Sequence, residues 1–279
     1  MRVAGVVGWP VGHSLSPRLH RFWLREHGLS GAYVPLPVRR RHFSTALEGL
    51  RAASLVGVNV TIPHKEAAFA VANVCDVTSR LAGAANLLLF HGDSVEARNT
   101  DAGGLEASLL EEMGADAIRG RQAIVLGAGG AARAAVLACD SLKATTIHIL
   151  NRSPGRARSL VDSLQNNISA TLSAGLLENW SVFAPAAHLL VNTTSLGMKG
   201  SASPALQLDL LPRDAFVCDI VYDPLETELL AHARELGLHG INGLGMLIHQ
   251  AVPAFEAFFG VRPEISASLR ADLEMALRR

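Results

Sequence analysis

The chain contains a glycine-rich segment whose residue types and spacing can bind the pyrophosphate of a dinucleotide. Gly127, Gly129 and Ala132 form the pattern Gly-x-Gly-x-x-Ala directly after the apolar run 123–126. The first glycine allows a sharp turn, the second lets the backbone approach the phosphates, and the small alanine keeps the helix close to the sheet. The alternative is a glycine-rich turn of an ordinary α/β protein. A second strand-like run at 145–150 favours the dinucleotide unit, because the ribose contact of such a unit follows about 20 residues later.

The residues that follow 145–150 indicate which dinucleotide binds. NAD-specific units place Asp or Glu there, and such a carboxylate would repel a 2′-phosphate. This chain has Asn151, Arg152, Ser153 and Arg156 instead. The two guanidinium groups can donate forked, charge-assisted hydrogen bonds to a phosphate. Solvated arginines are the alternative, but the N-terminus of a helix does not favour cations. We therefore expect NADP.

A second group of polar side chains lies where strands are expected to end, which is where open α/β sheets bind ligands. Most of its members are neutral hydrogen-bonding groups, which suit a substrate with several hydroxyl groups. Each member also has a structural alternative, since Ser16 can cap a helix and Asn86 can satisfy a strand end. The group comprises Ser14, Ser16, Asn59, Thr61, Lys65, Asn86 and Asp101.

Lys65 and Asp101 are the charged members of this group. Lys65 directly follows the expected strand 57–62, and Asp101 follows the expected strand 95–99. A lysine is seldom buried without a partner, so a solvated surface position is the alternative for Lys65. A helix N-cap is the alternative for Asp101. The residue pattern alone leaves these alternatives open.

Alternating strands and helices must position the glycine-rich segment and the polar side chains described above. This alternation predicts parallel sheets. One edge of the first sheet is expected to be antiparallel, because a hairpin-like turn joins its last two strands. The expected strands are 3–7, 33–38, 57–62, 83–90, 95–99, 123–126, 145–150, 189–192 and 215–221. The expected helices are 17–27, 41–53, 66–74, 78–81, 103–114, 154–165, 227–236, 244–258 and 263–277, besides the helix after the glycine fingerprint.

This order predicts a two-domain α/β fold. We expect an N-terminal substrate-binding α/β domain at 1–101 and a doubly wound, Rossmann-type NADP-binding domain at 102–239. The C-terminal helices within 240–279 are expected to pack back on the first domain and complete it.

Composition narrows the class of partner. Of 279 residues 49% are hydrophobic and 18% charged, as in globular enzymes. The 25 basic and 25 acidic residues give a formal net charge of zero, so we expect a small-molecule substrate and neither nucleic acid nor a membrane. No metal-ligand spacing is present, and the dispersed cysteines Cys75, Cys139 and Cys218 suggest reduced thiols and a cytoplasmic location. The sequence does not distinguish a monomer from a homodimer.

Short motifs run through the chain: Gly8-x-Pro10-x-x-His13-Ser14-x-Ser16-Pro17-x-x-His20, Gly57-x-Asn59-Val60-Thr61-x-Pro63-x-Lys65, Gly83-Ala84-x-Asn86, Asn99-Thr100-Asp101, Gly127-Ala128-Gly129-Gly130-Ala131, Asn151-Arg152, Asn192-Thr193-Thr194-Ser195-x-Gly197-Met198, Asp219-x-Val221-Tyr222-x-Pro224-x-x-Thr227 and Gly243-Leu244-Gly245-Met246-Leu247-x-x-Gln250. In this order they resemble the shikimate dehydrogenase family over nearly the whole chain. The resemblance implies an oxidoreductase that reversibly reduces 3-dehydroshikimate to shikimate with NADPH, in aromatic amino-acid biosynthesis through chorismate.

The resemblance also implies roles for individual residues. Lys65 and Asp101 would carry out the proton transfer of the reaction. The implied substrate contacts are Ser14, Ser16, Thr61, Asn86, Asp101, Tyr222 and Gln250, and the polar group above adds Asn59. The implied cofactor contacts are Gly127, Ala128, Gly129, Gly130 and Ala131 at the pyrophosphate, Asn151, Arg152, Ser153 and Arg156 at the ribose phosphate, and Ile220 and Gly243 at the nicotinamide.

The chain departs from the family's usual pattern at Arg21, Leu87 and Ala102, and none of these positions is a proposed catalytic group. Two other functions remain open at this point. One is a folate-linked methylene dehydrogenase, and the other is a ligand sensor without activity, because a fold does not fix a function. Quinate is an alternative substrate, since related enzymes accept it.

Overall fold

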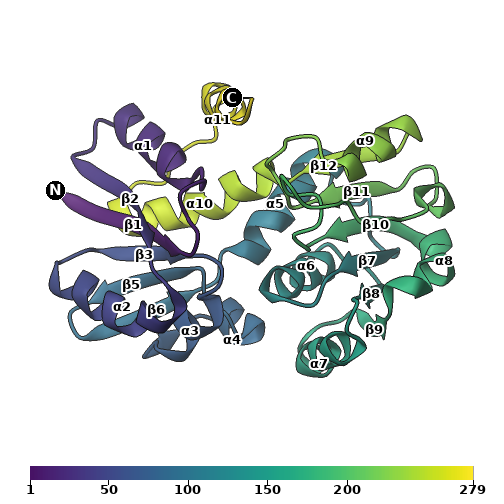
Figure 1. Ribbon diagram of the computed structural model, residues 1–279, viewed down its shortest axis with the longest axis horizontal. Coiled ribbons are helices and arrows are strands. Elements are labelled where there is room, and N and C mark those ends of the chain that lie inside the picture. Colours follow the sequence, from purple (N-terminus) through teal and green to yellow (C-terminus); the bar gives the residue numbers. More distant parts are fainter. Residues whose placement is uncertain (279) are drawn as a thin grey trace. The chain divides into compact units, whose positions relative to one another are not determined.

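The computed structural model describes residues 1–278, which form two compact units (Figure 1). Unit 1 joins Met1–Asp101 to the segment from Leu247 onward, and unit 2 comprises Ala102–Met246. Two helices cross the unit boundaries, α5 (Asp101–Met113) and α10 (Leu244–Phe259).

Unit 1 is built on a six-stranded mixed sheet with the order β2-β1-β3-β5-β6-β4. The pairs β1–β2, β1–β3 and β4–β6 are parallel, and β3–β5 and β5–β6 are antiparallel. The sheet therefore changes direction at β3, the strand that precedes Lys65 in the chain. Its strands are β1 (Arg2–Gly8), β2 (Gly31–Pro37), β3 (Gly57–Val60), β4 (Val74–Cys75), β5 (Leu87–His91) and β6 (Ser94–Arg98).

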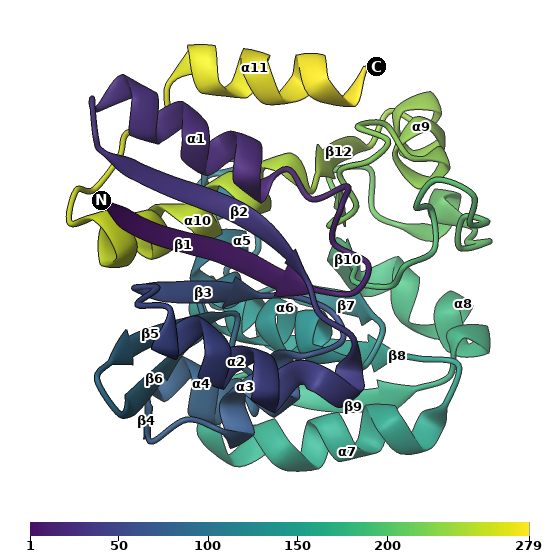
Figure 2. The same ribbon diagram turned by 60° about the vertical axis from the view of Figure 1, so that its left-hand side comes forward.

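Helices cover both faces of this sheet. On one face, Phe43 and Leu47 pack against strand residues such as Val58 and Leu88. On the other face, Trp23 and Phe255 belong to an aromatic cluster. Two helices lie side by side in Figure 2, α1 and α11, and an ion pair between Arg18 and Asp272 joins them at 2.6 Å. The helices of unit 1 are α1 (Ser16–Glu26), α2 (Phe43–Ala52), α3 (Lys65–Ala70), α4 (Val77–Ala82) and α11 (Ala267–Leu277), with a 3-10 turn at Arg40–His42.

Unit 2 contains a fully parallel six-stranded sheet with the order β12-β11-β10-β7-β8-β9, from top to bottom in Figure 1. Counted from β7, this is the 3-2-1-4-5-6 order of a Rossmann fold, with its switch point between β7 and β10. The strands are β7 (Gln122–Leu126), β8 (Thr146–Leu150), β9 (Thr171–Gly175), β10 (Ala187–Asn192), β11 (Phe216–Asp219) and β12 (His239–Asn242).

Alternating strand residues of unit 2 face two separate cores. Ala123 and Val125 pack with α5, α6 and α7, whereas Ile124 and Leu126 pack in the cluster that contains Trp180 and residues of α9. Both sheet faces are thus covered, as a parallel sheet requires. The helices are α6 (Gly130–Ser141), α7 (Pro154–Leu164), α8 (Trp180–Phe183) and α9 (Glu228–Glu235), with 3-10 turns at Gln165–Asn167, Leu177–Asn179, Ala184–Ala186 and Leu208–Leu210.

The α/β class, the Rossmann-type unit and the antiparallel β5–β6 pair confirm the predictions, and some element boundaries are wrong. The helix expected at 66–74 ends at Ala70, and Val74–Cys75 is strand β4. The strand expected from residue 83 begins at Leu87, because Gly83 is the left-handed C-cap of α4. The sequence prediction also lacks β9 and β12, which form the two edges of the second sheet.

Residues 1–278 show neither a membrane-spanning helix nor a metal-binding group of side chains. No helix in this range is long and apolar enough to cross a membrane. The same range holds no group of three or more His, Cys, Asp or Glu side chains arranged to bind a metal ion.

Candidate active site

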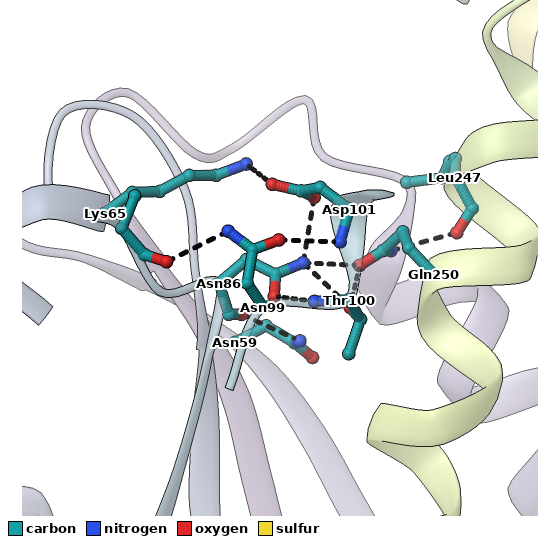
Figure 3. A network of polar contacts seen from close by, with 9 residues as sticks. Asn59, Lys65, Asn86, Asn99, Thr100, Asp101, Leu247 and Gln250 are labelled. Atoms are coloured by element: carbon teal, nitrogen blue, oxygen red, sulfur yellow. Dashed lines mark hydrogen bonds and ion pairs between the residues drawn. The ribbon is translucent and has the colours of Figure 1, made fainter. Parts of the chain in front are cut away.

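An ion pair between Lys65 and Asp101 lies at the centre of the polar residues of unit 1 (Figure 3). Lys65 is the first residue of α3 and Asp101 the first of α5, so each follows shortly after a strand of the sheet. Lys65 Nζ donates to Asp101 Oδ2 at 2.5 Å. The Lys65 side chain is 21% exposed and that of Asp101 only 7%. A charged hydrogen bond at this depth holds the ammonium in one place while leaving it accessible to a small molecule.

Neighbouring amide groups fix the Asp101 carboxylate and its backbone. Asn86 Nδ2 donates to Asp101 Oδ1 at 2.8 Å, and the backbone N–H of Asp101 donates to Asn99 Oδ1 at 3.0 Å. Asn99 Nδ2 in turn donates to the carbonyl of Ala84 at 2.9 Å. Asp101 thus reaches Lys65 through one oxygen while its other oxygen is held by an amide.

Asn86 connects the strand ends to α10. Besides Asp101, its Nδ2 contacts Thr100 Oγ1 at 2.8 Å and Gln250 Oε1 at 3.2 Å. Its Oδ1 accepts from the backbone N–H of Thr100 at 2.8 Å. Gln250 is itself oriented, since its Nε2 donates to the Leu247 carbonyl at 2.9 Å. Figure 3 shows Gln250 on its helix pointing toward Asn86 and Thr100, so residues distant in sequence meet at one point.

The other predicted substrate residues of unit 1 lie on the loop after β1, at the first residue of α1, on β3 and directly after β3. Ser14 Oγ accepts from the backbone N–H of Ser16 at 3.3 Å. The N-cap of α1 is Leu15 and not Ser16, so the capping alternative for Ser16 is wrong. Thr61 follows β3 and is half-buried. Asn59 is buried, and both of its polar atoms have partners within the protein.

The sequence prediction does not include Asn99 or Thr100 among the site residues. Both nevertheless contact residues of the site. Asn99 is 5% exposed and holds the Asp101 backbone, and Thr100 bonds Asn86. The sequence signal that could have identified them is the polar run Asn-Thr-Asp at the end of a strand, because buried polar groups need partners.

The glycine fingerprint of unit 2 has the geometry that a pyrophosphate requires. Gly127 has a φ of +108°, which L side chains rarely adopt, and a Cβ there would lie 2.7 Å from Thr193 Oγ1. Gly129 and Gly130 face open space, with nothing within 4 Å of an added Cβ. Gly129 is the N-cap of α6 and supplies no side-chain cap, so first-turn N–H groups remain for an anion. Ala132 is fully buried beneath them.

The segment after β8 presents cations and neutral donors. Arg152, Ser153 and Arg156 are exposed, and Asn151 is half-buried with its Nδ2 donating to the Ser153 carbonyl at 3.0 Å. No acidic residue stands between β8 and Arg156. This donor set fits a phosphate on the ribose better than a free 2′-hydroxyl.

A buried carboxylate organises the strand ends at β10 and β11. Asp219 is fully buried, and its Oδ1 accepts from Asn192 Nδ2 at 3.0 Å and from the Val221 backbone at 3.1 Å. Its Oδ2 accepts from the Thr227 hydroxyl at 2.8 Å. Burial raises the pKa of Asp219, and these three hydrogen bonds act in the opposite direction.

This carboxylate lies next in sequence to the predicted nicotinamide contacts. Ile220 follows Asp219 directly, and any Cβ at position 243 would collide with the Ile220 backbone, so only glycine fits there. Ile220 and Gly243 are therefore adjacent in space. Tyr222, the predicted substrate contact of unit 2, is half-buried two residues further along the chain.

The Rossmann-type unit with an open glycine turn, together with a lysine–aspartate pair among neutral donors, defines a dinucleotide-dependent oxidoreductase of α/β class. The comparisons with known proteins are more specific. Residues 6–88 match the family model described as shikimate dehydrogenase substrate binding domain, and residues 243–271 match that of the shikimate 5′-dehydrogenase C-terminal domain.

Whole-chain relatives agree with these models. The shikimate dehydrogenase (NADP(+)) of Rhodospirillum rubrum is 47% identical over 273 residues, 97% of this chain and 96% of that protein. This chain belongs to the shikimate dehydrogenase family.

Solved structures of similar fold include a shikimate dehydrogenase and a quinate dehydrogenase. Shikimate 5-dehydrogenase from Thermus thermophilus, in complex with NADP(H) and shikimate, superposes with a TM-score of 0.84 at 35% identity and covers 100% of this chain and 99% of its own. Quinate dehydrogenase from Corynebacterium glutamicum, in complex with NAD, has a TM-score of 0.89 at 26% identity and covers 98% of each chain.

Proposed function

We propose that this protein catalyses the reversible, NADPH-dependent reduction of 3-dehydroshikimate to shikimate in aromatic amino-acid biosynthesis. The observation that carries the proposal is the 2.5 Å Lys65–Asp101 pair among neutral hydrogen-bonding groups. Such a pair can exchange a proton with a substrate oxygen, while the neutral groups recognise hydroxyls. The formal net charge of zero also supports a small-molecule substrate rather than nucleic acid.

Lys65 supplies the proton in the direction of reduction. As the substrate carbonyl becomes an alcohol, its oxygen takes a proton from Lys65 Nζ, and the amine left behind regains one from water. Asp101 accepts a hydrogen bond from Nζ and stabilises the ammonium before transfer. In the direction of oxidation the neutral amine accepts the hydroxyl proton. The general acid and the general base are thus the same atom.

Neutral side chains of unit 1 bind and orient the substrate. An amide or a serine hydroxyl that bonds a substrate hydroxyl discriminates against an analogue without that hydroxyl. The analogue leaves the polar group of the protein buried and unpaired. We assign this role to Ser14, Ser16, Thr61, Asn86 and Gln250, with Tyr222 added from unit 2. The amide of Asn86 also holds Asp101, so substrate binding and proton transfer share one side chain.

The residues of unit 2 fit NADP. When bound, this cofactor supplies or accepts the hydride at the substrate carbon. Backbone N–H groups from Gly127 to Ala131 would hold its pyrophosphate, and Arg152 and Arg156 its ribose phosphate, with Asn151 and Ser153 adding neutral bonds. Ile220 and Gly243 would lie at the nicotinamide, where the tight contact between them leaves no room for a side chain.

The test is the change in nicotinamide absorbance with shikimate or quinate, each combined with NADP or NAD. We expect the highest kcat/KM for shikimate with NADP. The most informative comparison is with the pair quinate and NAD, because a structurally similar protein is a quinate dehydrogenase in complex with NAD. A higher kcat/KM for quinate with NAD would refute the proposal, as would the absence of turnover with any of the four pairs.

Lys65→Ala tests the role of the amine. We expect kcat to fall about 100-fold or more with a much smaller change in the KM for shikimate, because general acid–base catalysis acts on the transition state. Lys143, an exposed lysine of unit 2, offers a matched control, and Lys143→Ala should retain wild-type kcat. A Lys65→Ala enzyme with near-normal kcat would show that another group transfers the proton.

A further inference from the structure

Tyr33 is a buried tyrosine of β2 whose hydroxyl reaches a polar residue of β3, two strands away in the sheet. Its side chain is among the largest that are fully buried, and its hydroxyl donates to Asn59 Oδ1 at 2.7 Å. Asn59 Nδ2 donates to the backbone carbonyl of Asn86 at 3.1 Å. A continuous series of hydrogen bonds therefore runs from the core of unit 1 to the residue that holds Asp101.

The chemistry of these groups fixes the orientation of the Asn59 amide. The Asn86 carbonyl can only accept, so the Asn59 atom that faces it must be the donor Nδ2. Oδ1 then faces Tyr33, and the tyrosine must donate. If the Tyr33 hydroxyl is removed, Oδ1 is left buried without this partner, and only the bond from Nδ2 to the Asn86 carbonyl still orients the amide.

The surroundings of Tyr33 leave its hydroxyl available for this one task. The His20 ring stacks on the Tyr33 ring with centroids 3.9 Å apart and planes 3° apart, so their contact is through the ring faces. Both ring nitrogens of His20 are buried without a hydrogen-bond partner in the described structure. Burial raises the pKa of Tyr33 well above its ordinary value of 10.0, so the hydroxyl keeps the proton that it donates.

We propose that Tyr33 is a positioning residue for the proposed dehydrogenase reaction, acting through Asn59 on the backbone of Asn86. This proposal rests on the proposed function, because it concerns the same Lys65–Asp101 pair. Asn86 is 3% exposed, and its side chain bonds Asp101 Oδ1 at 2.8 Å, opposite the oxygen that accepts from Lys65. A shift of the Asn86 backbone moves that amide and with it the carboxylate that aligns the ammonium.

The series also gives Asn59 a role different from a plain substrate contact. One hydrogen of its Nδ2 is committed to Asn86, and Oδ1 is occupied by Tyr33. A substrate oxygen that meets this amide can accept from the remaining N–H. Tyr33 thus helps to orient the group that Asn59 presents, although the tyrosine itself is buried.

The test is Tyr33→Phe in the full chain, which removes one oxygen and keeps the ring that stacks on His20. We expect kcat for shikimate oxidation to fall about ten-fold, the order of effect of one lost hydrogen bond, with the KM for NADP unchanged. Val58→Ala is the matched control for stability, because Val58 is a buried neighbour of Asn59 that packs in the core cluster on one sheet face. It should lower the melting temperature and leave kcat near the wild-type value.

A double-mutant cycle separates positioning from simple stabilisation. If Tyr33 acts through Asn59, then Tyr33→Phe should change kcat less than two-fold or so in an Asn59→Ala background, since coupled residues are not additive. Equal effects in both backgrounds would overturn the proposal. So would a Tyr33→Phe enzyme that melts at a lower temperature yet keeps wild-type kcat and KM.

Asn59→Asp tests the second link independently, should Tyr33→Phe fail to fold. It keeps the side-chain size and the acceptor for Tyr33, but replaces the donor to Asn86 with an oxygen. We expect a fall in kcat of at least about ten-fold. A change confined to the KM for shikimate would make Asn59 a substrate contact and reject the positioning role. A wild-type protein inactive toward shikimate would instead reject the proposed function itself.

Discussion

Replacing His20 should make unit 1 more resistant to acid. His20 is fully buried in unit 1 between the rings of Tyr33, Trp23 and Phe255, and neither of its nitrogens has a hydrogen-bond partner within residues 1–278. This burial lowers its pKa from the ordinary 6.5 to about 3, because a charged imidazolium has no compensating group there. The folded state therefore excludes a proton that the unfolded chain binds.

The sign and the size of the effect follow from this difference. Below pH 6.5 the unfolded state binds the extra proton, so stability falls with falling pH until the folded pKa of about 3 is reached. The loss is about 1.4 kcal/mol per pH unit, hence about 2 kcal/mol at pH 5 and about 4 kcal/mol near pH 3, where the folded state begins to bind the proton. The value at pH 5 is insensitive to the folded pKa, provided that it lies below about 4.

Urea unfolding at pH 7 and pH 5, followed by a signal from Trp23 of unit 1, measures this quantity. His20→Phe keeps a ring against Tyr33 and removes the titration, so it should lose about 2 kcal/mol less than the wild type between the two pH values. His20→Leu offers a second, smaller replacement. Phe258→Leu is the matched control, because it perturbs the same cluster at all pH values and should keep the wild-type pH dependence. Equal pH dependence of wild type and both His20 variants would refute the reasoning.

Two further predictions concern ligand affinity. Arg152→Ala should weaken NADPH binding by about 2 kcal/mol, within the range for hydrogen bonds to charged groups, and should change NADH binding little. Titration with both cofactors measures the two affinities. Equal losses for NADPH and NADH would mean that Arg152 acts through the fold. Gln250→Ala should raise the KM for shikimate about ten-fold and leave the KM for NADP unchanged, because the Gln250 amide contacts Asn86. Steady-state kinetics measure both constants. A change in the KM for NADP alone would contradict the role of Gln250 as a substrate contact.

Local sequence patterns predict the parts of the fold that local physics determines. The turn at Gly127 follows from the glycine requirement of a positive φ, and the burial of Ala132 follows from close packing of helix on sheet. In the second sheet, the strands that the sequence prediction lacks are the edge strands β9 and β12. Thr171 in β9 and His239 in β12 are exposed, so neither strand shows the apolar run of a central strand.

The contacts of the candidate site depend on tertiary structure and could be predicted only as a set of residues. Asn86 and Gln250 are 164 positions apart, yet their amides meet at 3.2 Å. The internal bonds of Asn59 depend on the parallel pairing of β1 with both β2 and β3, which places Tyr33 two strands away from it. The sequence spacing between Tyr33 and Asn59 does not predict that pairing. From the sequence, Asn59 is therefore predicted to contact the substrate, whereas in the structure its amide is held by Tyr33 and Asn86.

Asp101 and Asp219 are both buried near strand ends, and their hydrogen-bond partners differ in a way that bears on the acid–base role proposed for Asp101 and Lys65. Asp219 receives its hydrogen bonds from an amide, a backbone N–H and a hydroxyl, all neutral donors that keep their protons. It can fix the loop containing Ile220, but these partners offer no proton to a substrate. Asp101 has a comparable burial and an amide on one oxygen, and differs in bonding Lys65 through the other. Because an ammonium can give up its proton and an amide cannot, the partner rather than the carboxylate decides which strand end can transfer a proton.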